Sequence, residues 1–261
     1  MIGAIAGDII GSTHEGEGTK TKDFPLFQDD SRFTDDTVLT VAVAACLLRG
    51  AEYVDTFHNY FHAYPQAGFG ESFIRWAGYR RRDPYQSWGN GSAMRVSPIG
   101  FAFDSLEEVM EQARRSAAVT HDHPEGIRGA QATAVAILLA RMGYEKQEMR
   151  DYLERQFGYR LTDRLEMIRA DYGFDVSCQG SVPQSIIAFL ESEDYEDAVR
   201  NAVSLGGDAD TMACIAGGIA EAFYGGIPGS IHERVLAMLD VPLRDIVEEF
   251  RERFGNRRIG R

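Results

Sequence analysis

Three observations predict an all-α fold for this sequence. Apolar residues recur with a helical period along most of the chain, and the alternation typical of half-buried strands is nearly absent. Helix start and stop residues flank the strongest segment, which begins at Pro124 and ends before Gly143. No Pro/Ser-rich linker, low-complexity run or internal repeat divides the chain. We therefore expect a single compact domain of orthogonally packed helices over residues 1–261.

The expected helices follow one another through most of the chain. A first, glycine-containing helix ends near Gly11 and leaves Glu15 on a loop. The most convincing helices cover 37–48, 124–142 and 210–224, and the first and last of these follow short acidic motifs. Amphipathic patterns predict further helices over 106–118, 145–157, 183–192, 195–205 and 243–254.

Two of these helices carry more glycine than helix propensity favours. Gly3, Gly7 and Gly11 recur at every fourth position, and Gly217-Gly218 lie inside the last Ala-rich helix. Each interior glycine costs about 0.5–1 kcal/mol relative to alanine. A ridge of small residues lets helix backbones approach closely, whether for core packing alone or to bring the motifs at their ends to one centre.

Composition excludes several classes of protein. A net charge of −13 with no basic patch argues against nucleic-acid binding. Cys46, Cys178 and Cys214 are odd in number and lack CxxC spacing, which fits a reducing cytosol. Asp8 interrupts the N-terminal apolar stretch, and the apolar run 38–48 is too short to span a bilayer. We expect a soluble, cytoplasmic protein, and a monomer, with no membrane partner.

Two acidic motifs carry the strongest chemical signal. Thr-Asp-Asp-Thr at 34–37 and Gly-Gly-Asp-Ala-Asp-Thr at 206–211 each precede an apolar helix. Asp and Thr there are also good N-caps, and capping is the commoner role for either motif alone. One cap per helix suffices, however, and four aspartates brought together would repel one another unless a cation neutralised them. Their hard oxygen ligands suit Mg²⁺, Mn²⁺ or Ca²⁺ and predict a two-metal site.

A glycine-rich turn at 87–91 is a second candidate site. Such a turn presents backbone N–H groups that can bind a phosphate, and Trp88 offers a flat face for a base. An ordinary connection between helices is the structural alternative. The segment 180–185 is interpreted as a loop that enters a helix at Pro183.

The pair His121 and His123 allows another interpretation. His-x-His is a possible metal pair, and His121-Asp122 resembles the all-α HD phosphohydrolases, although isolated histidines more often serve as caps or core residues. That alternative leaves both aspartate motifs without a role, so we keep it as the lesser one.

Taken in order, these motifs resemble the ADP-ribosylglycohydrolase family, which includes the dinitrogenase-reductase-activating glycohydrolases. The resemblance runs from Gly3 to Tyr224 and rests on the Gly-Asp-x-x-Gly start with Glu15, both aspartate motifs, Gly89-Asn90-Gly91 with Met94-Arg95, Thr120-His121 and Ser181-Val182-Pro183. It implies an all-α fold and hydrolysis of the glycosidic bond at C1″ of ADP-ribose, in ADP-ribosylated protein or small conjugates, with two Mg²⁺ or Mn²⁺ ions.

The resemblance also implies roles for individual residues. Glu15 and Asp36 are the carboxylates expected to handle the proton or stabilise charge at C1″. The implied metal ligands are Thr34, Asp35, Asp36, Asp208, Asp210 and Thr211. The implied ADP-ribose contacts are Ser87, Trp88, Gly89, Asn90, Gly91 and His121. Ala209 and His14 depart from the commonest family pattern, and His14 leaves the distal substrate pocket undefined.

The linkage that is cut is not encoded in these motifs. Arginine-, serine- and O-acetyl-linked ADP-ribose are all substrate classes within the family. A non-catalytic, crystallin-like member that binds ADP-ribose or metal is the competing interpretation, and retention of the four aspartates and Glu15 argues against it.

Overall fold

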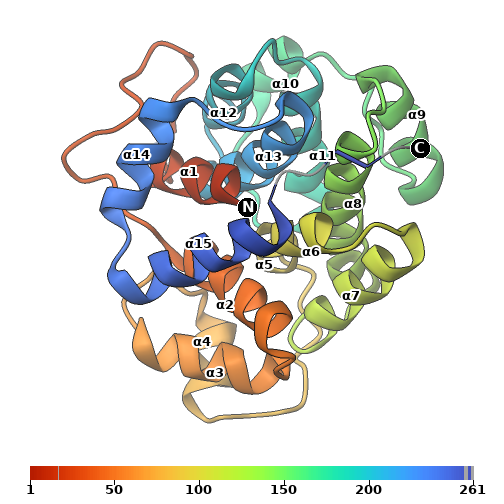
Figure 1. Ribbon diagram of the computed structural model, residues 1–261. Helices are drawn as coiled ribbons and strands as arrows, with labels where there is room; N and C mark the ends of the chain where they lie inside the picture. Colours follow the sequence, from red (N-terminus) through yellow and green to blue (C-terminus); the bar gives the residue numbers. More distant parts are fainter. Residues whose placement is uncertain (17, 256–257, 260–261) are drawn as a thin grey trace.

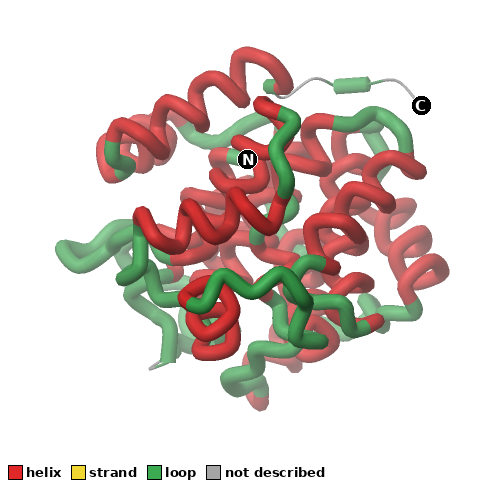
Figure 2. The backbone as a smooth tube through the Cα atoms, turned by 90° about the horizontal axis from the view of Figure 1, so that it is seen from below, coloured by secondary structure: helices red, strands yellow, loops and turns green. Residues whose placement is uncertain are grey.

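The computed structural model describes residues 1–16, 18–255 and 258–259 and confirms the all-α prediction. Within this part of the chain, helices are joined by loops, and β pairing is confined to one isolated bridge between Gly89 and Ser177 (Figure 2). In chain order the helices are α1 Ile2–Gly11, α2 Asp35–Arg49, α3 Tyr53–Ala63, α4 Glu71–Gly78, α5 Gly91–Met94, α6 Ser97–Ala102, α7 Leu106–Ala118, α8 Pro124–Arg141, α9 Lys146–Phe157, α10 Leu165–Asp171, α11 Cys178–Leu190, α12 Tyr195–Val203, α13 Ala209–Tyr224, α14 Gly229–Met238 and α15 Val241–Phe254.

The helices α1 and α13 form the centre of the molecule (Figure 1). Every residue of α1 is buried, and α13 is buried from Ala209 to Ala222. Around them, α13 packs on α8, α11 and α12, while α2 packs on α3, α6 and α15. One continuous apolar core joins these layers.

Close backbone approach between α1 and α13 confirms the predicted glycine ridge. A Cβ atom placed on Gly3 would lie 2.6 Å from the carbonyl oxygen of Gly217. One placed on Gly11 would lie 2.5 Å from that of Ala209. No real Cβ tolerates such distances, so only glycine permits this spacing. Because the two helices are in contact along this ridge, the end of α1 lies against the start of α13, where the second acidic motif is located.

Three helix starts differ from the sequence prediction by two residues or more. α15 begins at Val241, two residues before the expected start, with Asp240 as its N-cap. α2 begins at Asp35, two residues early, because Thr34 is its N-cap and its hydroxyl accepts a hydrogen bond from the Asp36 amide (3.3 Å). The prediction that residues 180–185 form a loop entering a helix at Pro183 is wrong. Instead, α11 begins at Cys178 with Ser177 as its cap, and Pro183 lies inside it. Pro183 removes one backbone hydrogen bond but leaves the helix continuous.

Some of the observed helices were not predicted from the sequence. They are α3, α4, α6, α10 and α14. Among the described residues, none of the helices is long and apolar enough to cross a membrane.

Candidate active site

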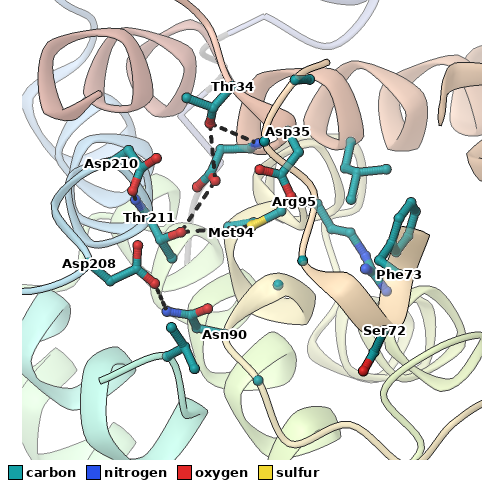
Figure 3. Close-up of a pocket in the computed structure, with 18 of the residues that line it drawn as sticks. Thr34, Asp35, Ser72, Phe73, Asn90, Met94, Arg95, Asp208, Asp210 and Thr211 are labelled. Carbon is teal, nitrogen blue, oxygen red and sulfur yellow. Dashed lines mark hydrogen bonds between the residues drawn. The ribbon is translucent and has the colours of Figure 1, made fainter. Parts of the chain in front are cut away.

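A polar cavity of about 390 Å³ opens where α2, α5 and α13 begin (Figure 3). Its walls contain every residue that the sequence predicted for the site except Trp88. These residues are Glu15, Thr34, Asp35, Asp36, Ser87, Gly89, Asn90, Gly91, His121, Asp208, Asp210 and Thr211. Motifs that lie up to 196 positions apart in the sequence, from Glu15 to Thr211, therefore share one cavity.

Carboxylates from three helices meet in and directly behind the wall of this cavity. Asp8 of α1, Asp36 of α2 and Asp210 of α13 each offer an oxygen atom within 4.8 Å of the other two. Glu15, Asp208 and Asp210 form a second group at the same spacing. Asp210 belongs to both groups and so links them. The fold thus provides two adjoining clusters of hard oxygen ligands.

Asp8 was not among the predicted site residues. It is fully buried, and its carboxylate accepts hydrogen bonds from the Thr34 amide (3.0 Å), the Thr34 hydroxyl (2.7 Å) and the Thr37 amide (3.1 Å). The Thr37 hydroxyl is a further donor. Asp8 therefore fastens the start of α2 to α1. The signal in the sequence was an acid inside an otherwise apolar helix, at the second position of the Gly-Asp-x-x-Gly start.

The electrostatics of the cluster favour a cation. Burial, followed by repulsion from Asp8, raises the pKa of Asp36 well above its usual value. Burial, reinforced by Asp36 and Asp208, does the same to the pKa of Asp210. For Asp35, burial and then Asp8 and Asp208 raise the pKa to about 8. Each carboxylate resists ionisation because it is buried beside other carboxylates, and a bound cation would offset both effects.

Asp36 provides the most direct test of whether a metal fits. Its Oδ2 accepts from the hydroxyl of Thr211 (3.3 Å) and lies 3.4 Å from the Thr34 hydroxyl oxygen, whose one hydrogen is directed at the nearer Asp8. Its Oδ1 is buried and has no hydrogen-bond partner in the described part of the chain. A buried carboxylate oxygen without a donor is costly, and a divalent cation would satisfy it. The residues present therefore fit a metal ion.

The glycine-rich turn is tied to the second carboxylate group. The Asn90 side-chain amide donates to Asp208 (2.7 Å) and to Ser181 (3.2 Å), as Figure 3 shows for Asp208. The Asn90 backbone amide donates to the Val176 carbonyl (2.7 Å). Asn90 thus orients Asp208, and a direct contact of Asn90 with a phosphate stays a prediction.

The aromatic and histidine residues divide between cavity and rim. Trp88 is 54% exposed and lies outside the cavity lining, and its ring centre is 5.7 Å from that of His123 in an edge-on arrangement. His123 caps α8, and Asp122 accepts from the Gln86 amide (2.7 Å). Only His121 of this segment lines the cavity, and neither described carboxylate group includes a histidine. The segment therefore forms helix and loop caps in place of an HD-type metal pair.

Comparison with known proteins decides between the remaining families. The model of the ADP-ribosylglycohydrolase family matches residues 1–260. The chain belongs to this family. It is accordingly a hydrolase of the ADP-ribosyl glycohydrolase class, and the resemblance noted in the sequence is confirmed.

Curated relatives and a solved structure agree with this assignment. Human ADP-ribosylhydrolase ARH3 is 28% identical, over 86% of this chain and 84% of its own. ADP-ribosylarginine hydrolase Tri1 of Pseudomonas putida (strain GB-1) is 29% identical over 62% of this chain and 45% of its own. A structure titled ADP-ribosylglycohydrolase-related protein complex superposes with a TM-score of 0.71 at 26% identity, covering 97% of this chain and 95% of that one.

Proposed function

We propose that this protein is a metal-dependent hydrolase that cleaves the glycosidic bond at C1″ of ADP-ribose in ADP-ribosylated proteins or small-molecule conjugates. The observation that carries the metal dependence is the buried Asp36 Oδ1, which has no hydrogen-bond donor among the described residues although it lies inside a group of three carboxylates. Family membership and the names of the relatives support ADP-ribose as the substrate. We also propose that the chain acts as a monomer in the cytoplasm.

The metal would be a pair of Mg²⁺ or Mn²⁺ ions. Thr34, Asp35 and Asp36 on one side and Asp208, Asp210 and Thr211 on the other would hold them. When bound, such ions would supply positive charge that lets water ionise near neutral pH, and they would also orient nearby hydroxyl groups. Asp8 would support this set by keeping Thr34 in place, since it accepts hydrogen bonds from both the amide and the hydroxyl of Thr34.

Glu15 and Asp36 would handle charge and protons at the reacting carbon. Glu15 lies on an exposed loop at the mouth of the cavity. Partial burial of its carboxyl, followed by repulsion from Asp208, raises its pKa. A raised pKa brings a carboxylate closer to the working pH, where it takes a proton more effectively. Departure of the leaving group gives C1″ oxocarbenium character, which a nearby carboxylate stabilises.

The remaining residues would bind the rest of ADP-ribose. Ser87, Gly89, Asn90, Gly91 and His121 line the cavity beside Asp208, where a pyrophosphate would hold the reacting bond in place. Trp88 stands outside this lining and would meet the adenosine part at the rim.

A substrate panel tests the proposal. The protein is incubated with Mg²⁺ and arginine-, serine- or O-acetyl-linked ADP-ribose, and released ADP-ribose is measured. We expect turnover of at least one linkage. The control is Glu15→Gln, which keeps size and one acceptor, and its kcat should fall by roughly 10²–10⁴. Binding of ADP-ribose without turnover of any linkage would favour a non-catalytic, crystallin-like role.

A further inference from the structure

Arg95 is a buried cation in the wall of the active-site cavity. Its side chain is 0% exposed, and its guanidinium carbon lies 4.7 Å from the centre of the Phe57 ring. Figure 3 shows it on the side of the cavity away from Asp208 and Asp210. No carboxylate forms an ion pair with it among the described residues, and its Nε and Nη1 have no hydrogen-bond partner there. Burying a charge without a partner ion is costly in desolvation free energy, so we expect Arg95 to have a role beyond packing.

Arg95 donates hydrogen bonds to Ser116 and Thr120. Nη2 donates to the Ser116 carbonyl (2.8 Å) and to the Thr120 hydroxyl oxygen (2.9 Å). A guanidinium has only donors, so the Thr120 oxygen must accept in this bond. The single hydrogen of the Thr120 hydroxyl therefore points elsewhere. Nδ1 of His121 lies 2.8 Å from the same oxygen and can accept it.

The direction of the hydrogen bond between Thr120 and His121 determines which ring nitrogen of His121 carries the hydrogen. A neutral imidazole has one N–H, so an Nδ1 that accepts leaves the hydrogen on Nε2. Burial, followed by the charge of Arg95, lowers the pKa of His121 well below its usual value and keeps the ring neutral. No described residue forms a hydrogen bond with Nε2.

Nε2 faces the glycine-rich turn. Cβ atoms placed on Gly91 and Gly89 would lie 3.3 and 3.5 Å from it, so both glycines leave this nitrogen uncovered. Since His121 also lines the cavity, its Nε2–H would meet whatever anionic group occupies the turn.

We propose that Arg95 and Thr120 form a hydrogen-bond relay that fixes His121 as its Nε2–H tautomer and aims that donor at a phosphate oxygen of the substrate. Arg95 and Thr120 are positioning residues, because they act through His121. The identity of the ligand rests on the proposed function, whereas the tautomer does not. Tyr85, whose ring centre lies 5.9 Å from that of His121, offers the other acceptor near Thr120.

Nitrogen NMR of the intact protein tests the tautomer without any ligand. Histidine is labelled with ¹⁵N in Mg²⁺-loaded protein, and the His121 signals are identified by their loss in His121→Gln. We expect the Nε2–H pattern in the parent protein, in Thr120→Ser, which keeps the hydroxyl, and in Tyr85→Phe, which removes the competing acceptor. The near-isosteric Thr120→Val should show a mixture of tautomers. An Nδ1–H pattern in the parent protein overturns the relay whether or not any variant folds.

Calorimetric titration with ADP-ribose tests the consequence. Thr120→Val should weaken binding about tenfold and Thr120→Ser less than about threefold, as loss or retention of one hydrogen bond predicts. In a His121→Ala background, Thr120→Val should cause no further loss, because the relay then has no endpoint. Independent losses in the double variant contradict the relay. If the parent protein does not bind ADP-ribose, the proposed function is wrong. The NMR experiment needs no ligand and therefore still tests whether Thr120 fixes the tautomer of His121.

Discussion

Gly7 lies so close to Ala213 that a Cβ atom on Gly7 would be 2.0 Å from the Ala213 carbonyl oxygen. Asp8 follows Gly7 on α1, and Asp210 lies one helical turn before Ala213 on α13. The contact between the two helix backbones therefore determines how near these two carboxylates come. Spacing that looks like core packing is also what assembles the cluster of Asp8, Asp36 and Asp210.

Replacing Gly7 with alanine should damage both the fold and the site. Because backbone atoms of α13 occupy the required space, we expect a loss of unfolding free energy of about 2–3 kcal/mol, in the upper range for overpacking. Urea denaturation measures this loss. Gly78→Ala is the control, since no atom lies within 4 Å of a Cβ placed there. Equal stability of the two variants would show that α1 and α13 are not in tight contact.

Stability of the metal-free protein should fall as pH rises through the neutral range. Asp35 has a pKa of about 8 in the folded protein against a usual value of 3.8. Between these values the folded state binds more protons than the unfolded state, so raising the pH favours unfolding. Metal binds the ionised carboxylates and should raise the melting temperature more at pH 8 than at pH 5.

Asp35→Asn isolates this effect from other titrating groups. The variant cannot ionise at position 35, so in EDTA its melting temperature should depend less steeply on pH between 5 and 8 than that of the parent. Circular dichroism melts at several pH values provide the comparison. Parallel curves for the two proteins would show that Asp35 ionises normally in the fold.

Asp36 and Asp210 should be the aspartates whose loss is least tolerated for metal binding. Asp210 belongs to both carboxylate groups, and Asp36 carries a buried oxygen for which the described part of the chain supplies no donor. Calorimetric titration with Mn²⁺ should give a lower stoichiometry for Asp36→Ala and for Asp210→Ala. The exposed Asp245→Ala serves as a control and should bind like the parent. Unchanged stoichiometry in both site variants would remove these residues from the ligand set.

Trp88 should contact the adenosine part of the ligand from the rim. Trp88→Ala is expected to weaken ADP-ribose binding by about 1–3 kcal/mol, the range for stacking of one base on an aromatic side chain. Quenching of Trp88 fluorescence on ADP-ribose addition gives a direct readout once the buried Trp76 is replaced by Phe. An unaltered dissociation constant would assign Trp88 only to its contact with His123.

The sequence predicted the parts of the fold that depend on local pattern. The long helices α2, α8 and α13 appeared with boundaries within two residues of those observed. Both aspartate motifs were recognised because several hard ligands cluster at each helix start. The start of α11 was predicted five residues late, at Pro183, because proline is common in the first turn of a helix. The actual cap is Ser177, whose hydroxyl accepts a hydrogen bond from the Gly180 amide.

Other features of the site depend on contacts between distant segments. In the sequence, Asp8 is a single acid in an apolar helix. Its role depends on the hydrogen bonds that it accepts from Thr34 and Thr37, which lie 26 and 29 positions away. The bond between Arg95 and Thr120 requires two segments to meet, and no spacing in the sequence announces it. Likewise, the sequence contains Trp88 in the glycine-rich turn but does not reveal which way its side chain points.

Metal removal tests the central claim most directly. The protein is treated extensively with EDTA, desalted, and assayed for release of ADP-ribose on the substrate that the panel identifies, before and after addition of Mg²⁺ or Mn²⁺. We expect turnover to vanish on metal removal and to return with either ion. Full turnover in protein shown by elemental analysis to be free of metal would contradict the assignment of the carboxylate cluster as a metal-dependent hydrolytic site.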